Sequence, residues 1–181
     1  GQSVLNLYKI LSKSDSNWEK WHIYIGDERC VPMRHKDRND QVINEIWLDN
    51  SKISKNNIHF IKAELGLLKA KLEYEKILKK IDKFDVVLLS MGEDGHIASL
   101  FPNHLYSEEQ MVVVEQNSPK LPKERVSMSY KRLNRAHYIF KLIIGESKQK
   151  AVTLLKQNAN LPITRVNGDF EKKYFCKSAI L

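Results

Sequence analysis

The sequence predicts a single α/β domain over residues 1–181, with a Rossmann-like, largely parallel sheet and helices on both of its faces. Short apolar runs rich in β-branched residues alternate with stretches whose apolar residues recur at helical spacing. No internal repeat, low-complexity tract or flexible linker divides the chain. With 181 residues, of which 42% are hydrophobic and 29% charged, the chain can form one sizeable core.

Strands and helices are expected in alternation along the chain. The strands are predicted at residues 21–26, 84–91, 111–116, 125–129 and 137–145, and the helices at residues 5–11, 41–48, 65–81 and 147–157. The run at residues 84–91 is almost continuously apolar, which is typical of a strand buried on both faces. The third helix is predicted from six apolar residues that share one helical face: Leu67, Ala70, Tyr74, Ile77, Leu78 and Ile81.

Basic residues exceed acidic ones by 30 to 22, which gives a net charge of +8. Nucleic acid, an anionic surface or a phosphorylated small molecule are the partners that such an excess permits. A lysine-rich solvated surface is the simpler interpretation, because most lysines lie on predicted helices. We predict neither a nucleic-acid nor a membrane partner, since the sequence has no nucleic-acid-binding motif and no apolar stretch of spanning length. Cys30 and Cys176 are too few for a disulfide framework, which favours a reducing, cytoplasmic setting.

The first candidate for chemistry follows the strand at residues 84–91. Ligands of open parallel sheets bind beyond the carboxyl ends of the strands, and this strand runs into Gly92, Asp94, Gly95 and His96. His96, expected at a strand-to-helix turn, is a candidate general base that the Asp94 carboxylate would orient. Gly92 and Gly95 would let the backbone approach a ligand closely. The alternative is a structural histidine that bonds a backbone carbonyl near a helix cap.

The second candidate is the charge triplet Asp27-Glu28-Arg29 after the strand at residues 21–26. The guanidinium fork of Arg29 suits a substrate oxyanion, and Asp27 would orient Arg29 or contact a hydroxyl; a local ion pair is the alternative. Arg125 and Lys148 are expected at the rim of the parallel sheet, with Lys148 at a helix N-terminus that favours phosphate. The remaining histidines lack metal-ligand spacing, so no metal site is predicted.

Five ordered blocks of the sequence resemble the 6-phosphogluconolactonase family: "GDERCVP", "FDVVLLSMGEDGHIASLFPNH", "SPKLPKERVSMS", "LNRAHYIFKLIIGESKQKAV" and "LPITRV". The resemblance runs from about Gly1 to the end of the chain. It implies the Rossmann-like fold shared with glucosamine-6-phosphate deaminases. It also implies hydrolysis of 6-phospho-D-glucono-1,5-lactone in the oxidative pentose phosphate pathway, without a required cofactor.

The resemblance also assigns roles to individual residues. His96 matches the general base of the family, Asp94 matches its carboxylate neighbour, and Arg29 matches the arginine of the active-site Asp-Glu-Arg motif. Arg125 and Lys148 match basic positions that hold the sugar phosphate in the wider superfamily. The expected partner is therefore a phosphorylated sugar lactone.

The chain departs from the family pattern at its beginning and near residue 38. Strands and a helix normally precede a Gly-Gly-Ser-Thr phosphate loop, whereas this chain starts with Gly1 at the second glycine, followed by Gln2 and Ser3. Ser3 keeps a hydroxyl for phosphate. The start at Gly1 suggests a fragment or a processed product, and a central part of the sheet is expected to be unpaired. Arg38 replaces the serine of an Asp-Ser-Asn motif beside Asn39, either as a phosphate contact or as a surface change.

Two other functions remain open from the sequence. A glucosamine-6-phosphate deaminase-like enzyme is disfavoured, because that family continues with Phe-Asn-Glu-Pro where residues 99–102 here contain no glutamate. Ile97, in place of a threonine common in lactonases, favours the deaminase. Against an inactive sugar-phosphate-binding relative stand the intact His96, Asp94 and Arg29. The sequence leaves open the oligomeric state and any fusion or association with a glucose-6-phosphate dehydrogenase.

Overall fold

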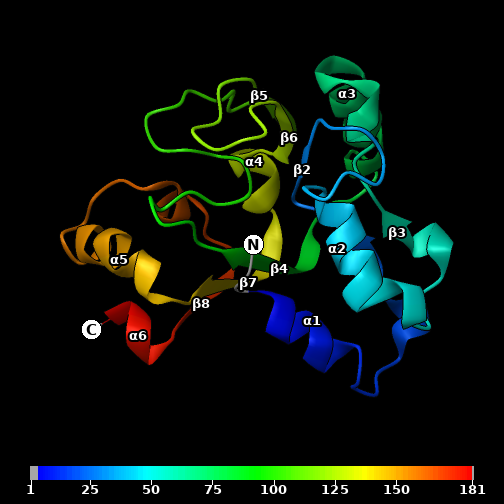
Figure 1. The fold of residues 1–181 in the computed structure, drawn as a ribbon, viewed down its shortest axis with the longest axis horizontal. Helices are drawn as coiled ribbons and strands as arrows, with labels where there is room; N and C mark the ends of the chain where they lie inside the picture. The colour runs from blue at the N-terminus through cyan, green and yellow to red at the C-terminus, as the bar shows by residue number, and fades with distance from the viewer. Residues whose placement is uncertain (1–3, 181) are drawn as a thin grey trace.

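The structure, a computed structural model, describes residues 4–180 and has an α/β architecture (Figure 1). The strands are β1 (Ile23–Tyr24), β2 (Asp27–Arg29), β3 (Ile58–His59), β4 (Phe84–Ser90), β5 (Val112–Glu115), β6 (Arg125–Met128), β7 (Ala136–Ile143) and β8 (Phe170–Phe175). The α-helices are α1 (Leu5–Leu11), α2 (Asn39–Ile46), α3 (Leu67–Leu78), α4 (Tyr130–Leu133), α5 (Gln149–Lys156) and α6 (Lys177–Ile180). Short 3₁₀ helices are η2 (Trp18–Lys20), η3 (Leu48–Asn50), η4 (Lys55–Asn57), η5 (Ala63–Leu65), η6 (Glu146–Lys148) and η7 (Pro162–Arg165).

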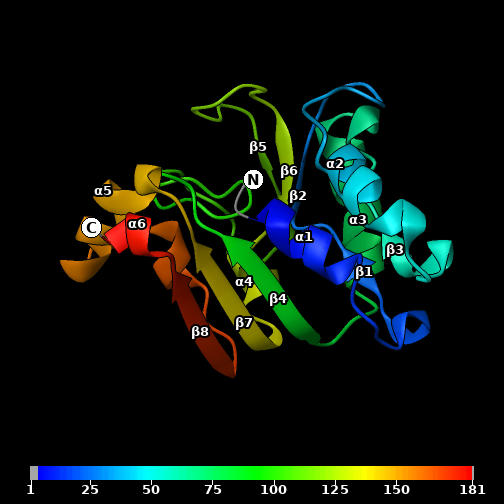
Figure 2. The ribbon, with the colours of Figure 1, turned by 60° about the horizontal axis from the view of Figure 1, so that its bottom comes forward.

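A parallel sheet of β4, β7 and β8, in that order, confirms the predicted class (Figure 2). Val87 of β4 lies opposite Ile139 of β7, and both are buried on the face that packs into the main core. β1 and β3 form a second, two-stranded parallel pair. The core is therefore built around parallel strands connected through helices, as in other α/β folds.

The opposite face of the β4–β7–β8 sheet is open in the described part of the chain. Val86, Tyr138 and Phe170 lie side by side on this face and are 53%, 47% and 64% exposed. The prediction that β4 is buried on both faces is therefore wrong, because Asp85 and Val86 are exposed and Leu88 and Ser90 are only partly buried. Among the described strands, β4 pairs only with β7, so its other edge is unpaired, which agrees with the expected unpaired part of the sheet.

A third sheet is antiparallel and consists of β2, β6 and β5. The triplet Asp27–Arg29, expected at the end of the strand at residues 21–26, forms a strand of its own, because β6 supplies a hydrogen-bonding partner from Gly26 onward: Met128 N donates to Gly26 O at 2.8 Å. Arg125 opens β6 and lies directly opposite Arg29. The prediction that Arg125 lies at the rim of the parallel sheet is wrong, since its strand belongs to this antiparallel sheet.

The helical predictions were sound where an apolar face is buried. In α3, Ala70, Tyr74 and Leu78 recur every four residues and are at most 1% exposed. The segments β3, β8, α4 and α6 were not predicted: β3, α4 and α6 have only two or four residues, and every residue of β8 is exposed. Such an edge strand lacks the apolar alternation that reveals a half-buried strand.

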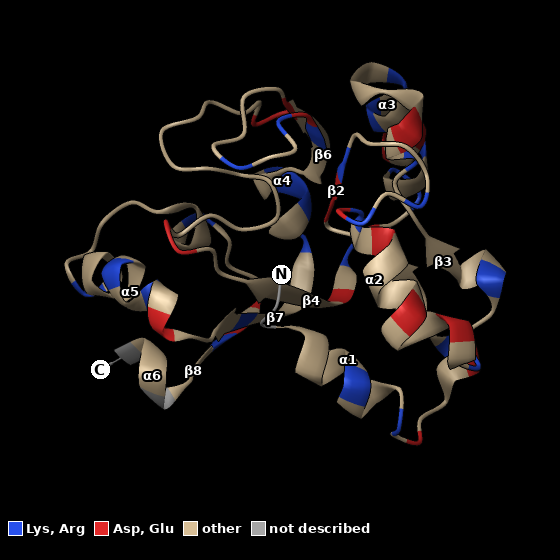
Figure 3. Cartoon of the chain, viewed as in Figure 1, with Lys and Arg blue, Asp and Glu red and all other residues tan. Residues whose placement is uncertain are grey.

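Charged residues are interspersed over the surface of the fold (Figure 3). Lys and Arg segments alternate with Asp and Glu segments on helices and loops, and no single described element carries the positive charge. This distribution agrees with a solvated, lysine-rich surface. None of the described helices combines the length and apolar character needed to cross a membrane.

Candidate active site

The loop after β4 brings Asp94 and His96 into direct contact. His96 Nδ1 lies 2.5 Å from Asp94 Oδ1, and the same oxygen accepts the backbone N–H of His96 at 3.1 Å. Burial raises the pKa of Asp94, but the hydrogen bonds from His96 outweigh it and lower this pKa to about 2. Asp94 is therefore a carboxylate at neutral pH and fixes one nitrogen of the imidazole. The other nitrogen, Nε2, is left for chemistry.

Gly92 and Gly95 shape the seat of this histidine. A Cβ atom on Gly92 would lie 2.1 Å from Cε1 and from Nδ1 of His96, so only glycine lets the ring pack against this backbone. Gly95 has φ of +88°, and a Cβ there would lie 2.8 Å from Cδ1 of Leu161. Close packing thus explains why both positions are glycine. Their contact with substrate stays a prediction.

No helix begins after His96, in contrast to the expected strand-to-helix turn. Leu100 N instead donates to Ile97 O at 2.9 Å and closes a tight turn in which Ala98 has φ of +47°. The turn is held by the rest of the fold: the hydroxyl of Ser99 donates to Asp27 Oδ2 at 2.6 Å. The chain therefore needs no helix to fix the loop, because β2 holds it directly.

Asp27 joins three segments of the site. Besides Ser99, it is held by Asn39, whose Nδ2 donates to Asp27 O at 2.8 Å and lies 3.3 Å from Asp27 Oδ1. Asn39 opens α2, so this side chain connects the helix to β2. The structure thus places the predicted residues Asp27 and Asn39 together and beside the loop that carries His96.

Two arginines face each other across the β2–β6 pair. Arg29 and Arg125 are directly opposite, a like-charge pairing that costs stability, and Glu115 of β5 lies opposite Arg125 on the other side of β6, where its charge acts against this cost. Arg125 is 4% exposed and donates to the carbonyl oxygens of Pro122 at 3.0 Å and Lys120 at 2.9 Å. Burial, and then the charge of Arg29, lower the pKa of Arg125. Arg29 Nη1 donates to Asp37 O, while its Nε is buried without a hydrogen-bond partner.

Phe101 connects the arginine pair with the histidine. Its buried ring lies 4.7 Å from the ring of His96, between centroids, and the guanidinium carbon of Arg125 lies 5.6 Å from its centroid. The ring of Phe101 therefore lies beside both the imidazole of His96 and the guanidinium of Arg125. Phe101 could not be singled out from the sequence, because only the folded loop turns its ring toward both groups.

Glu28, the middle residue of the triplet, has a structural role that the sequence did not reveal. It is 1% exposed and accepts three backbone N–H groups at 2.8 Å, those of Arg29, Asn39 and Asp40. Burial raises the pKa of Glu28 to about 7 against the effect of these bonds. Its carboxylate thereby fixes the first turn of α2 onto β2.

Arg38 is held in a buried ion network. It is 3% exposed; Nε and Nη2 bond Asp40, and Nη1 bonds Val31 O and Glu64 Oε2, both at 3.1 Å. Neither sequence-based alternative, a phosphate contact or a surface change, describes this arrangement. The reason is that two carboxylates already neutralise the guanidinium inside the fold.

Lys148 precedes α5, as predicted, and lies in a mixed charge environment. Burial, and then the nearby charge of Lys120, lower its pKa, while Glu93 and Asp94 act in the opposite direction. Lys120 also pairs with Glu93, Nζ to Oε1, at 2.6 Å. Lys148 is thus electrostatically connected to the loop of Asp94. The predicted residues Gly1 and Ser3 lie outside the described residues.

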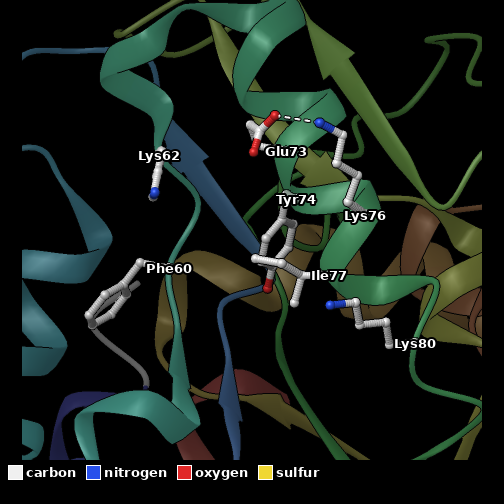
Figure 4. A pocket seen from close by; sticks show the side chains of 7 residues that line it. All are labelled: Phe60, Lys62, Glu73, Tyr74, Lys76, Ile77 and Lys80. Carbon is white, nitrogen blue, oxygen red and sulfur yellow. Dashed lines mark hydrogen bonds and ion pairs between the residues drawn. The ribbon is translucent and has the colours of Figure 1, made fainter.

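Two hollows of the described surface contain none of the predicted site residues. One, of about 240 Å³, lies along α3 (Figure 4) and is lined by seven residues: Phe60, Lys62, Glu73, Tyr74, Lys76, Ile77 and Lys80. The Tyr74 hydroxyl donates to Ile25 O at 2.8 Å, which makes that tyrosine part of the scaffold. The other, of about 610 Å³, lies beside α5 and Phe175. Among the described residues, no group of three or more His, Cys, Asp or Glu is arranged to hold a metal ion.

Known proteins share this sequence and fold over nearly the whole chain. Residues 1–175 match the family of glucosamine-6-phosphate isomerases/6-phosphogluconolactonase. The 6-phosphogluconolactonase of Thermotoga maritima is 32% identical over 178 residues, which cover 97% of this chain and 80% of that protein. The chloroplastic 6-phosphogluconolactonase 3 of Arabidopsis thaliana is 34% identical over 182 residues, which cover 90% of this chain and 56% of that protein.

Solved structures agree with these matches. The crystal structure of the Thermotoga maritima 6-phosphogluconolactonase has a TM-score of 0.90 at 31% identity, over 97% of this chain and 81% of that one. A monomeric glucosamine-6-phosphate deaminase has a TM-score of 0.76 at 18% identity, over 98% of this chain and 80% of that one, which is a likeness of fold alone. The chain belongs to the glucosamine-6-phosphate isomerase/6-phosphogluconolactonase family.

Proposed function

We propose that this chain hydrolyses 6-phospho-D-glucono-1,5-lactone to 6-phospho-D-gluconate, with His96 as the general base. The observation that carries the proposal is the Asp94–His96 pair. The ring of Phe101 lies beside both His96 and Arg125, and Arg125 lies opposite Arg29. A base and an anion-binding pair in one place suit an ester whose carbonyl oxygen becomes negative during attack. The relatives named 6-phosphogluconolactonase, at 32% and 34% identity, support the same activity.

The base step follows from the fixed imidazole. Asp94 accepts the Nδ1 proton, so Nε2 of His96 carries the lone pair. Nε2 takes a proton from water as the water oxygen bonds to the lactone carbonyl carbon. The tetrahedral intermediate then collapses, the bond from this carbon to the ring oxygen breaks, and the imidazolium returns the proton to that oxygen. One water is consumed, and His96 ends in its starting state.

Different cations bind the two negatively charged parts of the substrate, which are the oxyanion formed on the carbonyl oxygen and the 6-phosphate. Arg29, with a buried Nε that has no protein partner, stabilises the oxyanion that forms on the carbonyl oxygen. Arg125 and Lys148 hold the 6-phosphate, together with the hydroxyl of Ser3 and the backbone of Gly1. Asp27, fixed by Asn39 and Ser99, contacts a sugar hydroxyl. No cofactor takes part in these steps.

The test is hydrolysis of freshly prepared lactone above its spontaneous rate. The wild-type chain is compared with His96→Ala and with His137→Ala, a matched control whose imidazole also bonds a carboxylate, Nδ1 to Asp169 Oδ2 at 2.9 Å. We expect His96→Ala to lower kcat by about 10²- to 10⁴-fold, the usual contribution of a general base, and His137→Ala to leave it unchanged. A cytoplasmic location stays a prediction, since one relative is named as chloroplastic.

Each other outcome has a definite meaning. Full activity in a folded His96→Ala variant would exclude His96 as the base while leaving the substrate assignment intact. Turnover of glucosamine 6-phosphate in place of the lactone would assign the chain to the deaminase chemistry of the family. A folded wild-type chain that binds 6-phosphogluconate but hydrolyses nothing would identify an inactive relative.

A further inference from the structure

Glu115, the last residue of β5, is a buried carboxylate that the proposed reaction does not use. It is 4% exposed, and three donors converge on it. Oε2 accepts the hydroxyl of Tyr106 at 2.6 Å and Nδ1 of His104 at 2.7 Å, while Oε1 accepts the backbone N–H of Asn117 at 2.6 Å. A carboxylate with this many short bonds is a rigid anchor point, since each charge-assisted bond restrains its partner.

Tyr106 connects Glu115 to the loop that carries His96 through its hydrogen bonds. Its hydroxyl oxygen accepts the backbone N–H of Phe101 at 3.0 Å and lies 3.3 Å from the carbonyl oxygen of Ser99. Burial, and then the bond to Glu115, raise the pKa of Tyr106, so the phenol keeps its proton and donates it to the carboxylate. One phenol thus holds the loop backbone on both sides of Leu100.

The ring of Phe101 restrains the orientation of the His96 imidazole. Its ring lies between those of His96, at 4.7 Å, and His104, at 5.8 Å between centroids. The bond to Asp94 fixes the direction of one nitrogen of His96, but a single hydrogen bond does not fix the tilt of the ring. Besides the Gly92 backbone against which the ring packs, a further restraint on that tilt comes from Phe101. Its backbone N–H is bonded to Tyr106, and its ring contacts that of His104, a partner of Glu115.

We propose that Glu115 and Tyr106 are positioning residues for His96: they hold Phe101 as the wall that keeps Nε2 aimed at the attacking water. Neither residue touches substrate in this account. The inference rests on the proposed function and adds to it a second carboxylate that acts at a distance. Its chemical reason is that general-base catalysis needs the acceptor nitrogen within hydrogen-bond reach of the water.

The main test is Tyr106→Phe, which removes the bridging hydroxyl and keeps the ring. The matched control is Tyr130→Phe, because Tyr130 is also buried, its ring lies 6.3 Å from that of Tyr106, and the guanidinium carbon of Arg165 lies 4.0 Å from its ring centroid. We expect Tyr106→Phe to lower kcat about tenfold with KM within about twofold of wild type, since a misplaced base weakens only the transition state. Glu115→Gln should act in the same direction, and Tyr130→Phe should leave kcat unchanged.

A purely structural role predicts different results. If Tyr106→Phe and Tyr130→Phe lower kcat equally, or if Tyr106→Phe raises KM and weakens 6-phosphogluconate binding as much as it lowers kcat, the positioning role is overturned. A second measurement does not depend on activity. The NMR signals of the His96 ring, assigned by their loss in His96→Ala, should shift in Tyr106→Phe and not in Tyr130→Phe. Unshifted signals overturn the inference, while a wild-type chain without lactonase activity overturns only the proposed function.

Discussion

Asp94 and Glu28 are both carboxylates within short polar motifs, yet the fold gives them opposite properties. Glu28 is almost fully buried, accepts three backbone N–H groups, and has a pKa raised to about 7 by burial. Asp94 also loses solvent, which raises its pKa, but its bonds with His96 outweigh burial and bring the pKa to about 2. The two acids thus have different pKa values because burial outweighs the hydrogen bonds of Glu28, whereas the bonds with His96 outweigh the weaker burial of Asp94.

The difference shows how to separate a catalytic acid from a scaffold acid. The partners of Glu28 are backbone groups that cannot change charge, so its bonds only fix α2 onto β2. The partner of Asp94 is a side chain that can take up a proton, so its bond sets which nitrogen of His96 is free. Burial and the nature of the partner therefore both separate the two acids, and under the proposed function only Asp94 has a partner that takes up a proton.

The largest expected effect tests the catalytic side of this comparison. Asp94→Asn keeps the size of the side chain but presents an amide to His96 Nδ1 and removes the charge that holds the correct tautomer. We expect kcat to fall about 10³-fold, while the free energy of unfolding changes by less than about 1 kcal/mol. Steady-state hydrolysis of the lactone and urea denaturation measure the two quantities. Asp85→Asn, at an exposed acid of β4, is the control; a kcat for Asp94→Asn as high as that of this control would contradict the pairing.

The next effect concerns the scaffold acid. Glu28→Ala leaves three backbone N–H groups without their acceptor, that of Arg29 in β2 and those of Asn39 and Asp40 at the start of α2, and each buried orphan donor is costly. We expect the free energy of unfolding to fall by about 3 kcal/mol, measured by urea denaturation. The kcat of the protein that remains folded should fall less than in Asp94→Asn. Wild-type stability in Glu28→Ala would show that Glu28 is not the anchor of α2.

The contrast between these acids also explains which parts of the site the sequence could predict. Asp94 and His96 are two residues apart, so a single turn suffices to bring them together, and that pairing was predictable from the motif. Arg29 and Arg125 are far apart in the chain, and their opposition depends on strand register. Nothing local in either segment specifies that register, so the arginine pair could not be predicted.

The same distinction between local and distant partners applies to the fold. The helix α3 was predictable because its buried residues repeat within one segment. The exposed edge strand β8 was not, because its pairing with β7 is a property of the sheet and not of its own sequence. Arg38 combines a local and a distant partner. Asp40 is two residues away in the chain, whereas Glu64, which also pairs with the guanidinium, comes from a distant segment.

The pH dependence of stability should reveal Glu28 directly. Its pKa is about 7 in the folded chain against an ordinary 4.5, so the folded state keeps a proton that the unfolded state releases between these values. This stabilisation is fully present below pH 4.5 and is lost as the pH rises through 7. We expect wild type to lose on the order of 2 kcal/mol relative to Glu28→Gln between pH 4.5 and 8. A difference between the two proteins that does not vary with pH would contradict the raised pKa.

Asp94 should produce the opposite slope, with the smallest amplitude. Its folded pKa of about 2 lies below the ordinary 3.8, so its contribution is present above pH 3.8 and is lost as the pH falls through about 2. Because the side chain is 34% exposed, solvent screens the interaction, and we expect less than about 1 kcal/mol. Urea denaturation of wild type and Asp94→Asn at pH 5 and pH 3 measures it. The advantage of wild type should shrink toward pH 3, whereas the advantage that protonated Glu28 confers should persist there. Slopes of the same sign for both acids would contradict the opposite directions of their pKa shifts.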